Sequence, residues 1–168
     1  DFHLEGGAIN EDVFAYTNHQ DGQSALVVYH NKYAETSGWI HTSAPYLVKQ
    51  GSEGHLETQN LAEALGLNGN YTDLVLFQDQ ISKRYYLRRL HEFREQGLFV
   101  RLQSYDCQVL MNFKIVSGPY YEELFLRLNG RGVTDLDRAM DELIHEHLLE
   151  TLRQVFSLES LDTLAGIN

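Results

Sequence analysis

The chain of 168 residues has a single cysteine, two prolines, few basic residues and no long apolar run. Because Cys107 is alone, an intrachain disulfide is excluded, and a reducing compartment such as the cytoplasm is favoured, although the compartment itself stays unknown. No stretch approaches the roughly 18 apolar residues of a membrane span, and no signal peptide is recognisable. We therefore expect a soluble protein without a membrane partner.

Basic side chains are scarce, with 13 lysine and arginine residues against 24 acidic residues and a formal net charge of −11. Nucleic acid requires a basic binding surface, so we expect no nucleic-acid partner. A (β/α)₈ barrel needs roughly 200–250 residues, so the length excludes a barrel-type catalytic site. The sequence lacks a phosphate-binding loop, a dinucleotide fingerprint and a Gly-x-Ser-x-Gly elbow, and we expect no cofactor.

Short apolar segments of strand length fill the region between residues 13 and 116. The continuous apolar run at 25–29 predicts a strand that is buried on both faces. Residues 1–12 are polar and predict a linker, and 44–72 interrupt the strands with a loop-like segment at 51–54 and a short helix at 58–65. About seven to eight strands at this spacing predict a mainly β fold with α, namely an antiparallel β-sandwich with a C-terminal helical segment. The expected strands are 13–17, 25–29, 38–43, 73–77, 83–87, 98–102 and 108–116.

The apolar period changes from two to 3.6 after Ser117. This change divides the chain into a β-sandwich domain at 1–117 and a helical extension at 118–168 that packs on it. Thr134 and Asp137 resemble a capping box at the start of a long helix that ends near Phe156, where a last short helix follows. A lone helix does not keep a wide apolar face in water, so we expect the sheet or a partner chain to cover it. The eight residues expected on that face are Leu136, Met140, Leu143, Ile144, Leu148, Leu152, Val155 and Phe156.

The residues that most resemble a catalytic or metal site do not have the required spacing. His145 and His147 stand two positions apart, whereas a zinc-binding helix presents histidines at i and i+4, so we expect no metal site. The acidic residues form no recognisable paired-carboxylate motif, and we identify no catalytic residue. The chain alone is therefore predicted to be non-catalytic.

Aromatic side chains are the one feature with a ligand-binding interpretation. Trp39, Tyr71 and Tyr85 lie on or beside expected strands. A flat aromatic surface can stack on the apolar face of a sugar ring, which makes these three the candidate ligand-binding residues. The alternative is that such aromatic residues fill the core of the sandwich.

Two segments carry a resemblance to a known family. The strand end Val-Val-Tyr-His-Asn at 27–31 and the segment 97–109, which contains a turn at Tyr105, resemble the all-β C-terminal domain of α-amylase-family glycoside hydrolases. The resemblance covers about residues 10–116. It implies a domain without catalytic residues, because the catalytic Asp, Glu and Asp of that family belong to a preceding barrel and match no position here.

The resemblance implies an accessory domain of an α-amylase-like glycosidase acting on α-glucosidic bonds. Its partner would be the catalytic barrel of the parent protein, which it would stabilise, with α-glucan as a further expected contact. Two alternatives stay open: an independent carbohydrate-binding module, and a small stand-alone enzyme that uses a carboxylate pair. A large exposed apolar face on the sandwich would favour the first hypothesis. A solvent-facing row of aromatic residues would favour the second, and a deep cleft with two facing acids the third.

Overall fold

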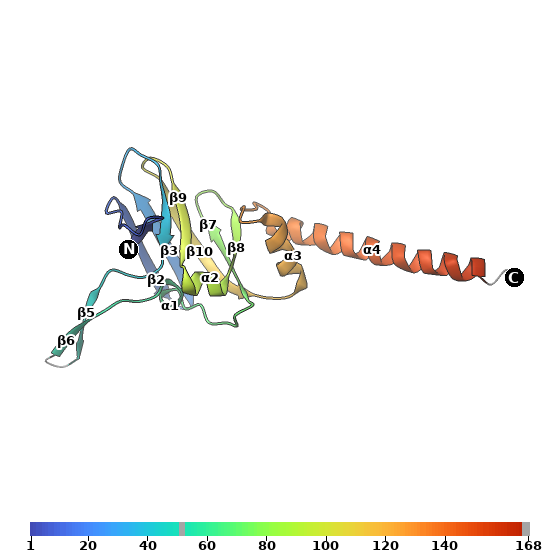
Figure 1. Cartoon of the computed structure of the whole chain (residues 1–168), viewed down its shortest axis with the longest axis horizontal. Coiled ribbons are helices and arrows are strands. Elements are labelled where there is room, and N and C mark those ends of the chain that lie inside the picture. Colours follow the sequence, from blue (N-terminus) through green and yellow to red (C-terminus); the bar gives the residue numbers. More distant parts are fainter. Residues whose placement is uncertain (51–52, 166–168) are drawn as a thin grey trace.

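Two antiparallel sheets pack face to face in the computed structural model, which describes residues 1–50 and 53–165 and the side chains of 1–49 and 54–157 (Figure 1). The five-stranded sheet has the order β2-β3-β10-β7-β8, and the three-stranded sheet has the order β1-β4-β9. The predicted fold class, mainly β with α in antiparallel sheets, is confirmed. The first sheet contains β2 (Val13–Gln20), β3 (Gln23–His30), β10 (Cys107–Val116), β7 (Leu74–Asp79) and β8 (Tyr85–Arg89); the second contains β1 (Phe2–Leu4), β4 (Thr36–Ile40) and β9 (Leu98–Leu102).

The main core lies between these sheets and is closed at one end by two short helices, α1 (Leu61–Ala64) and α2 (Leu90–Glu95). The inward side chains of β9 meet those of β7 and β10 there. Phe93 of α2 packs edge-on against Phe77 of β7, with ring centroids 6.4 Å apart. The burial of these large apolar side chains supplies the main stabilisation of the two packed sheets. We call these sheets, together with α1, α2 and the helix Pro119–Leu128, the body.

Strand β7 contributes to a second core on the opposite face of the five-stranded sheet. Val75 and Phe77 belong to the main core, whereas Leu74 and Leu76 point to the other side. There they contact the helical C-terminal region, where α3 (Pro119–Leu128) and α4 (Leu136–Ala165) follow the last strand. Because successive side chains of a strand point to opposite faces, the unbroken apolar run of β7 requires a cover on both sides.

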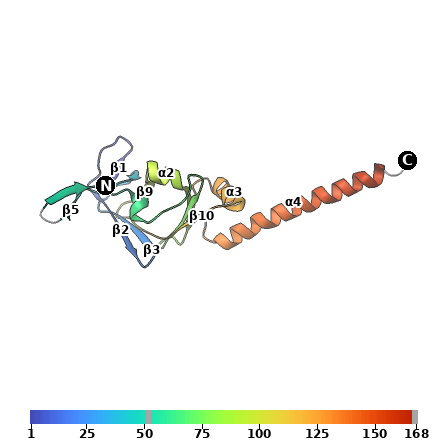
Figure 2. The same cartoon turned by 90° about the horizontal axis from the view of Figure 1, so that it is seen from below.

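Helix α4 is continuous and leaves the body. Figures 1 and 2 show it extending away from the sandwich, while a hairpin of β5 (Tyr46–Gln50) and β6 (Glu53–Glu57) projects from the opposite end. The helix begins after Asp135, whose Oδ1 accepts a hydrogen bond of 3.0 Å from the backbone N–H of Arg138. The expected capping box of Thr134 and Asp137 is therefore wrong by one residue, and the expected last short helix is a continuation of α4. Within the described residues, no helix has both the length and the apolar character that a membrane span needs.

Three further expectations from the sequence are corrected by the structure. Residues 2–4 form β1 instead of a linker, because Phe2 is fully buried against the main core. The β5–β6 hairpin lies where no strand was expected, so the described strands number ten; of the loop expected at 51–54, residues 51–52 lie outside the described residues and 53–54 belong to β6. Strand β3 is buried on one face only, since Leu26 and Val28 are buried while Tyr29 is exposed. The helices cover β7 and β8 and do not reach the outer face of β3.

Gly97 is required by the close approach of two elements. It follows α2 with φ of +84°, and a Cβ at this position would lie 2.1 Å from the carbonyl oxygen of Ile40 in β4. Both the left-handed backbone and this clash exclude a side chain.

We expect Gly97→Ala to lower the free energy of unfolding by about 3 kcal/mol or more, because the left-handed conformation alone costs about 1–2 kcal/mol and the clash adds to it. The matched control is Gly22→Ala, at φ of +76° with no atom within 4 Å of the new Cβ, which should cost only about 1–2 kcal/mol. Urea unfolding followed by Trp39 fluorescence measures both. Equal losses in the two variants would contradict the close-approach argument.

Candidate functional site

Helix α3 is fixed to the five-stranded sheet by one apolar contact and one ion pair. Leu124 is buried in the second core against the side chains of β7 and β8. Beside it, Arg89 of β8 forms a bidentate pair with Glu122, in which Nη1 lies 2.7 Å from Oε2. The guanidinium also stacks over Phe125, 4.4 Å from the ring centroid. The hydrogen bond to Arg89 is the main cause of a lowered pKa of Glu122.

The first turns of α4 pack on α3 through the same core. Leu143 is fully buried, and Leu136, Ala139 and Met140 are partly buried against this cluster. These residues are spaced by three or four positions, so they lie on one side of the helix. The apolar attachment of α4 to the body ends at Leu143.

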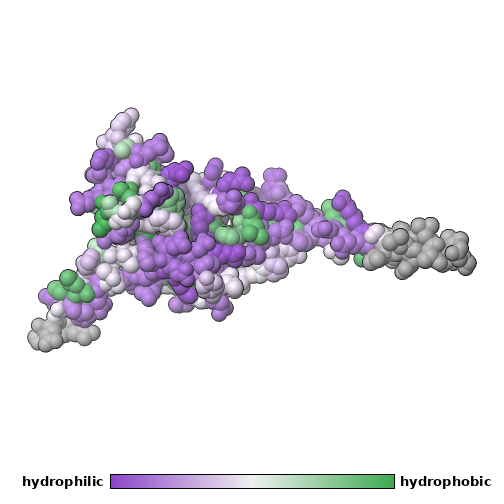
Figure 3. Space-filling view, viewed as in Figure 1, coloured by the Kyte–Doolittle hydropathy of each residue, from purple (hydrophilic) through white to green (hydrophobic). Residues whose placement is uncertain are grey.

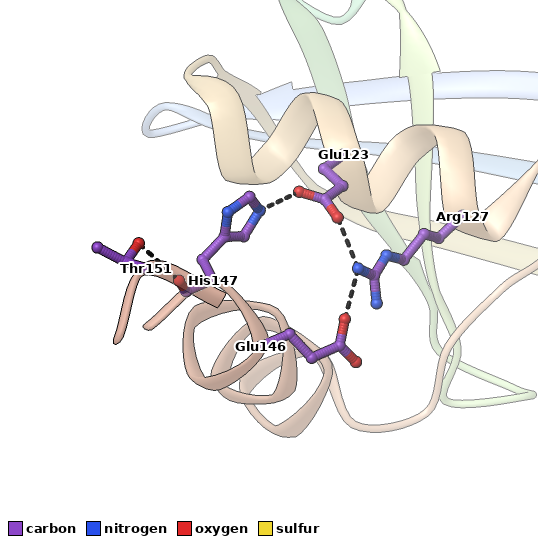
Figure 4. Close-up of polar contacts among 5 residues, drawn as sticks. All are labelled: Glu123, Arg127, Glu146, His147 and Thr151. Atoms are coloured by element: carbon purple, nitrogen blue, oxygen red, sulfur yellow. Dashed lines mark hydrogen bonds and ion pairs between the residues drawn. The ribbon is translucent and has the colours of Figure 1, made fainter. Parts of the chain in front are cut away.

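A polar junction continues the attachment for one more turn (Figure 4). Arg127 of α3 lies between two carboxylates, with Nη2 2.6 Å from Oε1 of Glu123 and 2.6 Å from Oε2 of Glu146 on α4. The other oxygen of Glu123 accepts a hydrogen bond from Nε2 of His147. The hydrogen bonds with His147 and then Arg127 lower the pKa of Glu123, and the hydrogen bond with Arg127 lowers the pKa of Glu146. Among the hydrogen bonds and ion pairs of the described side chains, those of this junction, Glu123–Arg127–Glu146–His147, are the last that join α4 to the body.

Beyond the junction, α4 presents an apolar surface to solvent. The side chains that form this surface are between 43% and 56% exposed, and Figure 3 shows hydrophobic patches along a helix that is otherwise hydrophilic. At about 100° per residue they occupy a sector roughly 140° wide, which is broader than the seam of a two-stranded coiled coil. We name this surface the α4 stripe, and it consists of Ile144, Leu148, Leu149, Leu152 and Val155.

The expectation that the apolar residues of α4 lie on a single face is wrong. Many of them follow each other at intervals of four, and each such step turns about 40° around the helix axis. From Leu136 to Phe156, the direction in which these side chains point therefore turns around the helix axis by roughly 200°. As a result, Leu136 faces α3 while Leu148 and Leu152 face away from the body. The row of i, i+4 spacings was visible in the sequence and is the signal that would have predicted two faces.

The three candidate sugar-binding residues are not brought together. Trp39 is half-buried on the outer face of the three-stranded sheet, where it packs edge-on against Phe99 at 5.1 Å. Tyr85 is half-buried on the outer face of the five-stranded sheet, in the second core. Tyr71 lies in the loop before β7 and is 64% exposed. Its ring stacks on that of His91 of α2, with centroids 4.3 Å apart. Two of the three therefore lie on opposite outer faces of the sandwich, so together they form no continuous stacking platform.

A groove with a volume of about 570 Å³ opens at the edge of the sandwich along β2. Phe14 and Tyr16 of β2 line one side, and Leu61 and Ala64 of the α1 segment line the other. The terminal amino group of Asp1 lies at this groove and donates a hydrogen bond of 2.7 Å to the carbonyl of Thr42, while burial lowers its pKa. The walls are mainly apolar. Among the described residues, no three His, Cys, Asp or Glu side chains are grouped to hold a metal ion.

The pKa directions at the polar junction predict how α4 responds to acid. The folded pKa values of Glu123 and Glu146 lie below the usual value of about 4.5, so their stabilising contribution is present above that pH and is lost as the pH falls through the folded values. We expect amide-exchange protection of residues 143–150 to fall between pH 5 and about pH 3, before the core of the body exchanges. In Glu123→Gln/Glu146→Gln, protection of this segment should already be low at pH 7 and change little with pH. An unchanged pH profile in this variant would contradict the assignment.

In comparisons with protein-family models, curated proteins and solved structures, no match to this chain was found.

Proposed function

We propose that this chain is a non-catalytic assembly module that associates with a second copy of itself through the α4 stripe. The observation that carries the proposal is a continuous helix that leaves the body and exposes a wide apolar sector (Figures 1 and 3). An exposed stripe of this width on a helix is normally buried against another helix. The body of the same chain cannot cover it, because the stripe begins where the contacts with α3 end.

The charges of α4 favour a second copy as the occupant. Although the chain has a net charge of −11, the helix between residues 144 and 157 carries only Glu146, Glu150 and Arg153 besides its two histidines. Glu146 is already paired with Arg127 of the body. Two copies of this segment can therefore approach without strong repulsion between like charges. Residues 144–157 offer little charge that would complement a strongly acidic or basic partner.

The area of the surface is also sufficient for contact between copies. Five half-exposed aliphatic side chains on each of two copies, with the polar residues beside them, would bury on the order of 1,000 Å² in total, near the lower limit for a stable interface. The C-terminal part of α4 lies away from the sandwich in both views (Figures 1 and 2), so that two such helices can pair without contact between the bodies.

We expect the protein to form dimers or higher oligomers at micromolar concentration, and Leu148→Gln/Leu152→Gln to raise the dissociation constant at least about 100-fold, because both leucines lie at the centre of the stripe. Sedimentation equilibrium measures the mass, and circular dichroism confirms that the helix is retained. The matched control is Glu150→Gln on the opposite side of the helix, which should leave the dissociation constant within about threefold of wild type. A wild-type protein that stays monomeric at about 100 μM would overturn the proposal.

An accessory role next to another domain is the second candidate function. The observation that favours it is the β5–β6 hairpin, in which Leu47 and Leu56 face each other across the two strands and are 56% and 69% exposed. This apolar surface is separate from α4 and suits contact with a neighbouring domain. The hypothesis that this neighbour is the catalytic barrel of an α-amylase-like glycosidase, with α-glucan as a further contact, stays a prediction from the sequence.

The accessory hypothesis predicts that this chain alone does not hydrolyse starch, maltooligosaccharides or aryl α-glucosides, because the family's acids lie in the barrel. Release of reducing ends above a heat-inactivated control is the measurement. Turnover that disappears when a single carboxylate is changed to its amide would instead favour the stand-alone enzyme.

A further inference from the structure

The arginines of this acidic chain fall into two groups. Arg89, Arg127 and Arg138 each form an ion pair with a glutamate. The other six form no ion pair with any residue that the structure describes, although the chain has 24 acidic side chains against 13 basic ones. Apart from Arg94 and Arg153, these unpaired arginines line two neighbouring cavities. These four are Arg84, Arg88, Arg101 and Arg131.

Three of the four line one cavity, which we name the arginine pocket. It has a volume of about 720 Å³, and its basic side chains come from three separate segments: Arg84 before β8, Arg101 on β9 and Arg131 in the loop between α3 and α4. A neighbouring cavity of about 260 Å³ shares Tyr86 and Arg101 with it and adds Arg88. The fold thus brings together four positive charges from three segments of the sequence, at residues 84–88, at 101 and at 131.

The hydrogen bonds of these guanidinium groups leave most donors available. Arg88 donates to the carbonyls of Leu87 and Gly130 at 2.8 and 3.1 Å, and burial lowers its pKa. Arg131 donates from Nε to the carbonyl of Leu128 at 3.2 Å. The guanidinium groups of Arg84 and Arg101 donate to no other residue within the described part of the chain. Planar guanidinium donors without a carboxylate partner suit an external oxyanion.

The backbone around the pocket is held in place by the fold. Tyr85 and Val133 exchange two backbone hydrogen bonds of 2.7 and 3.0 Å, which attach the α3–α4 loop to the edge of β8. Gly132 packs so closely on Tyr86 that a Cβ would lie 2.7 Å from the Cζ atom of the ring. The loop that carries Arg131 therefore has a fixed path beside β8.

The one carboxylate that lines either cavity among the described residues is Asp79, in the smaller cavity. Its Oδ1 accepts hydrogen bonds from the backbone N–H groups of Ile81 and Val109 at 3.1 and 3.4 Å, and its Oδ2 accepts one from Ser82 at 3.1 Å. Asp79 is buried and serves the turn between β7 and β8. Asp79 offsets part of the positive charge of the smaller cavity. No carboxylate among the described residues lines the larger pocket, so its three arginines have no carboxylate partner there.

We propose that the arginine pocket binds the phosphate or sulfate group of a small ligand. Three like charges around one cavity, with Arg88 in the cavity beside it, repel each other, and a dianionic group relieves this repulsion while it accepts hydrogen bonds from several guanidinium groups. The rest of the surface is acidic overall and repels anions, so binding at this place is specific to the pocket. The proposal rests on observations independent of the α4 stripe.

The test is titration calorimetry of the full chain at constant ionic strength with three probes: inorganic phosphate, inorganic sulfate and a hexose phosphate. We expect saturable binding that Arg101→Gln/Arg131→Gln weakens at least tenfold. Tighter binding of the hexose phosphate identifies an esterified ligand, and equal binding identifies the free ion. The matched control, Arg138→Gln/Arg153→Gln on α4, removes the same charge away from the pocket and should bind as wild type does.

Thermal unfolding separates a binding role from a structural role. We expect phosphate at millimolar concentration to raise the Tm of wild type and of the control variant but not of Arg101→Gln/Arg131→Gln. Without ligand, the pocket variant should melt at or above the wild-type temperature, because it removes repulsion. No saturable binding below about 10 mM, or equal binding by the wild type and the pocket variant, would overturn the proposal.

Discussion

The rest of the structure depends on the double burial of β7. Its four consecutive apolar residues alternate between two cores, so the strand is stable only when both faces of the five-stranded sheet are covered around it. The three-stranded sheet covers one face, and α3 with the first turns of α4 covers the other. This requirement explains why the helical region is joined to the sandwich at β7 and β8, and why β3, two strands away, keeps an exposed outer face.

Much of this arrangement was predictable from local sequence patterns. Strand β9 was expected at its observed bounds, Leu98–Leu102, because its short apolar segment alternates in the way that is typical of a strand. The errors share a physical cause: whether a strand face is buried depends on residues that are distant in sequence. An apolar run at 25–29 is the same in sequence whether a helix covers its second face or not. Phe2 likewise gives no local sign that it fills a core built from strands much later in the chain.

The candidate surfaces differ in how far the sequence specified them. The residues of the α4 stripe were recognised as apolar, and their i, i+4 spacing contains the rotation that takes Leu148 away from α3. The arginine pocket was not recognised, because Arg84, Arg101 and Arg131 belong to three segments that only the packed fold brings together. The aromatic hypothesis assumed that exposed rings on strands share a face, whereas Trp39 and Tyr85 lie on the outer faces of different sheets.

The polar junction between α3 and α4 has a mechanical consequence. At about 1.5 Å per residue, α4 is roughly 45 Å long, and the contacts that its described side chains make with the body lie within about its first 12 residues. The remainder is a lever whose pivot is the contact of Arg127 with Glu146 and of Glu123 with His147. A tilt of about 10° at this pivot displaces the far end of the helix by roughly 5 Å. Small changes in four side chains therefore set the position of the far end of the helix, and with it the distance and angle between any two bodies that the helices join.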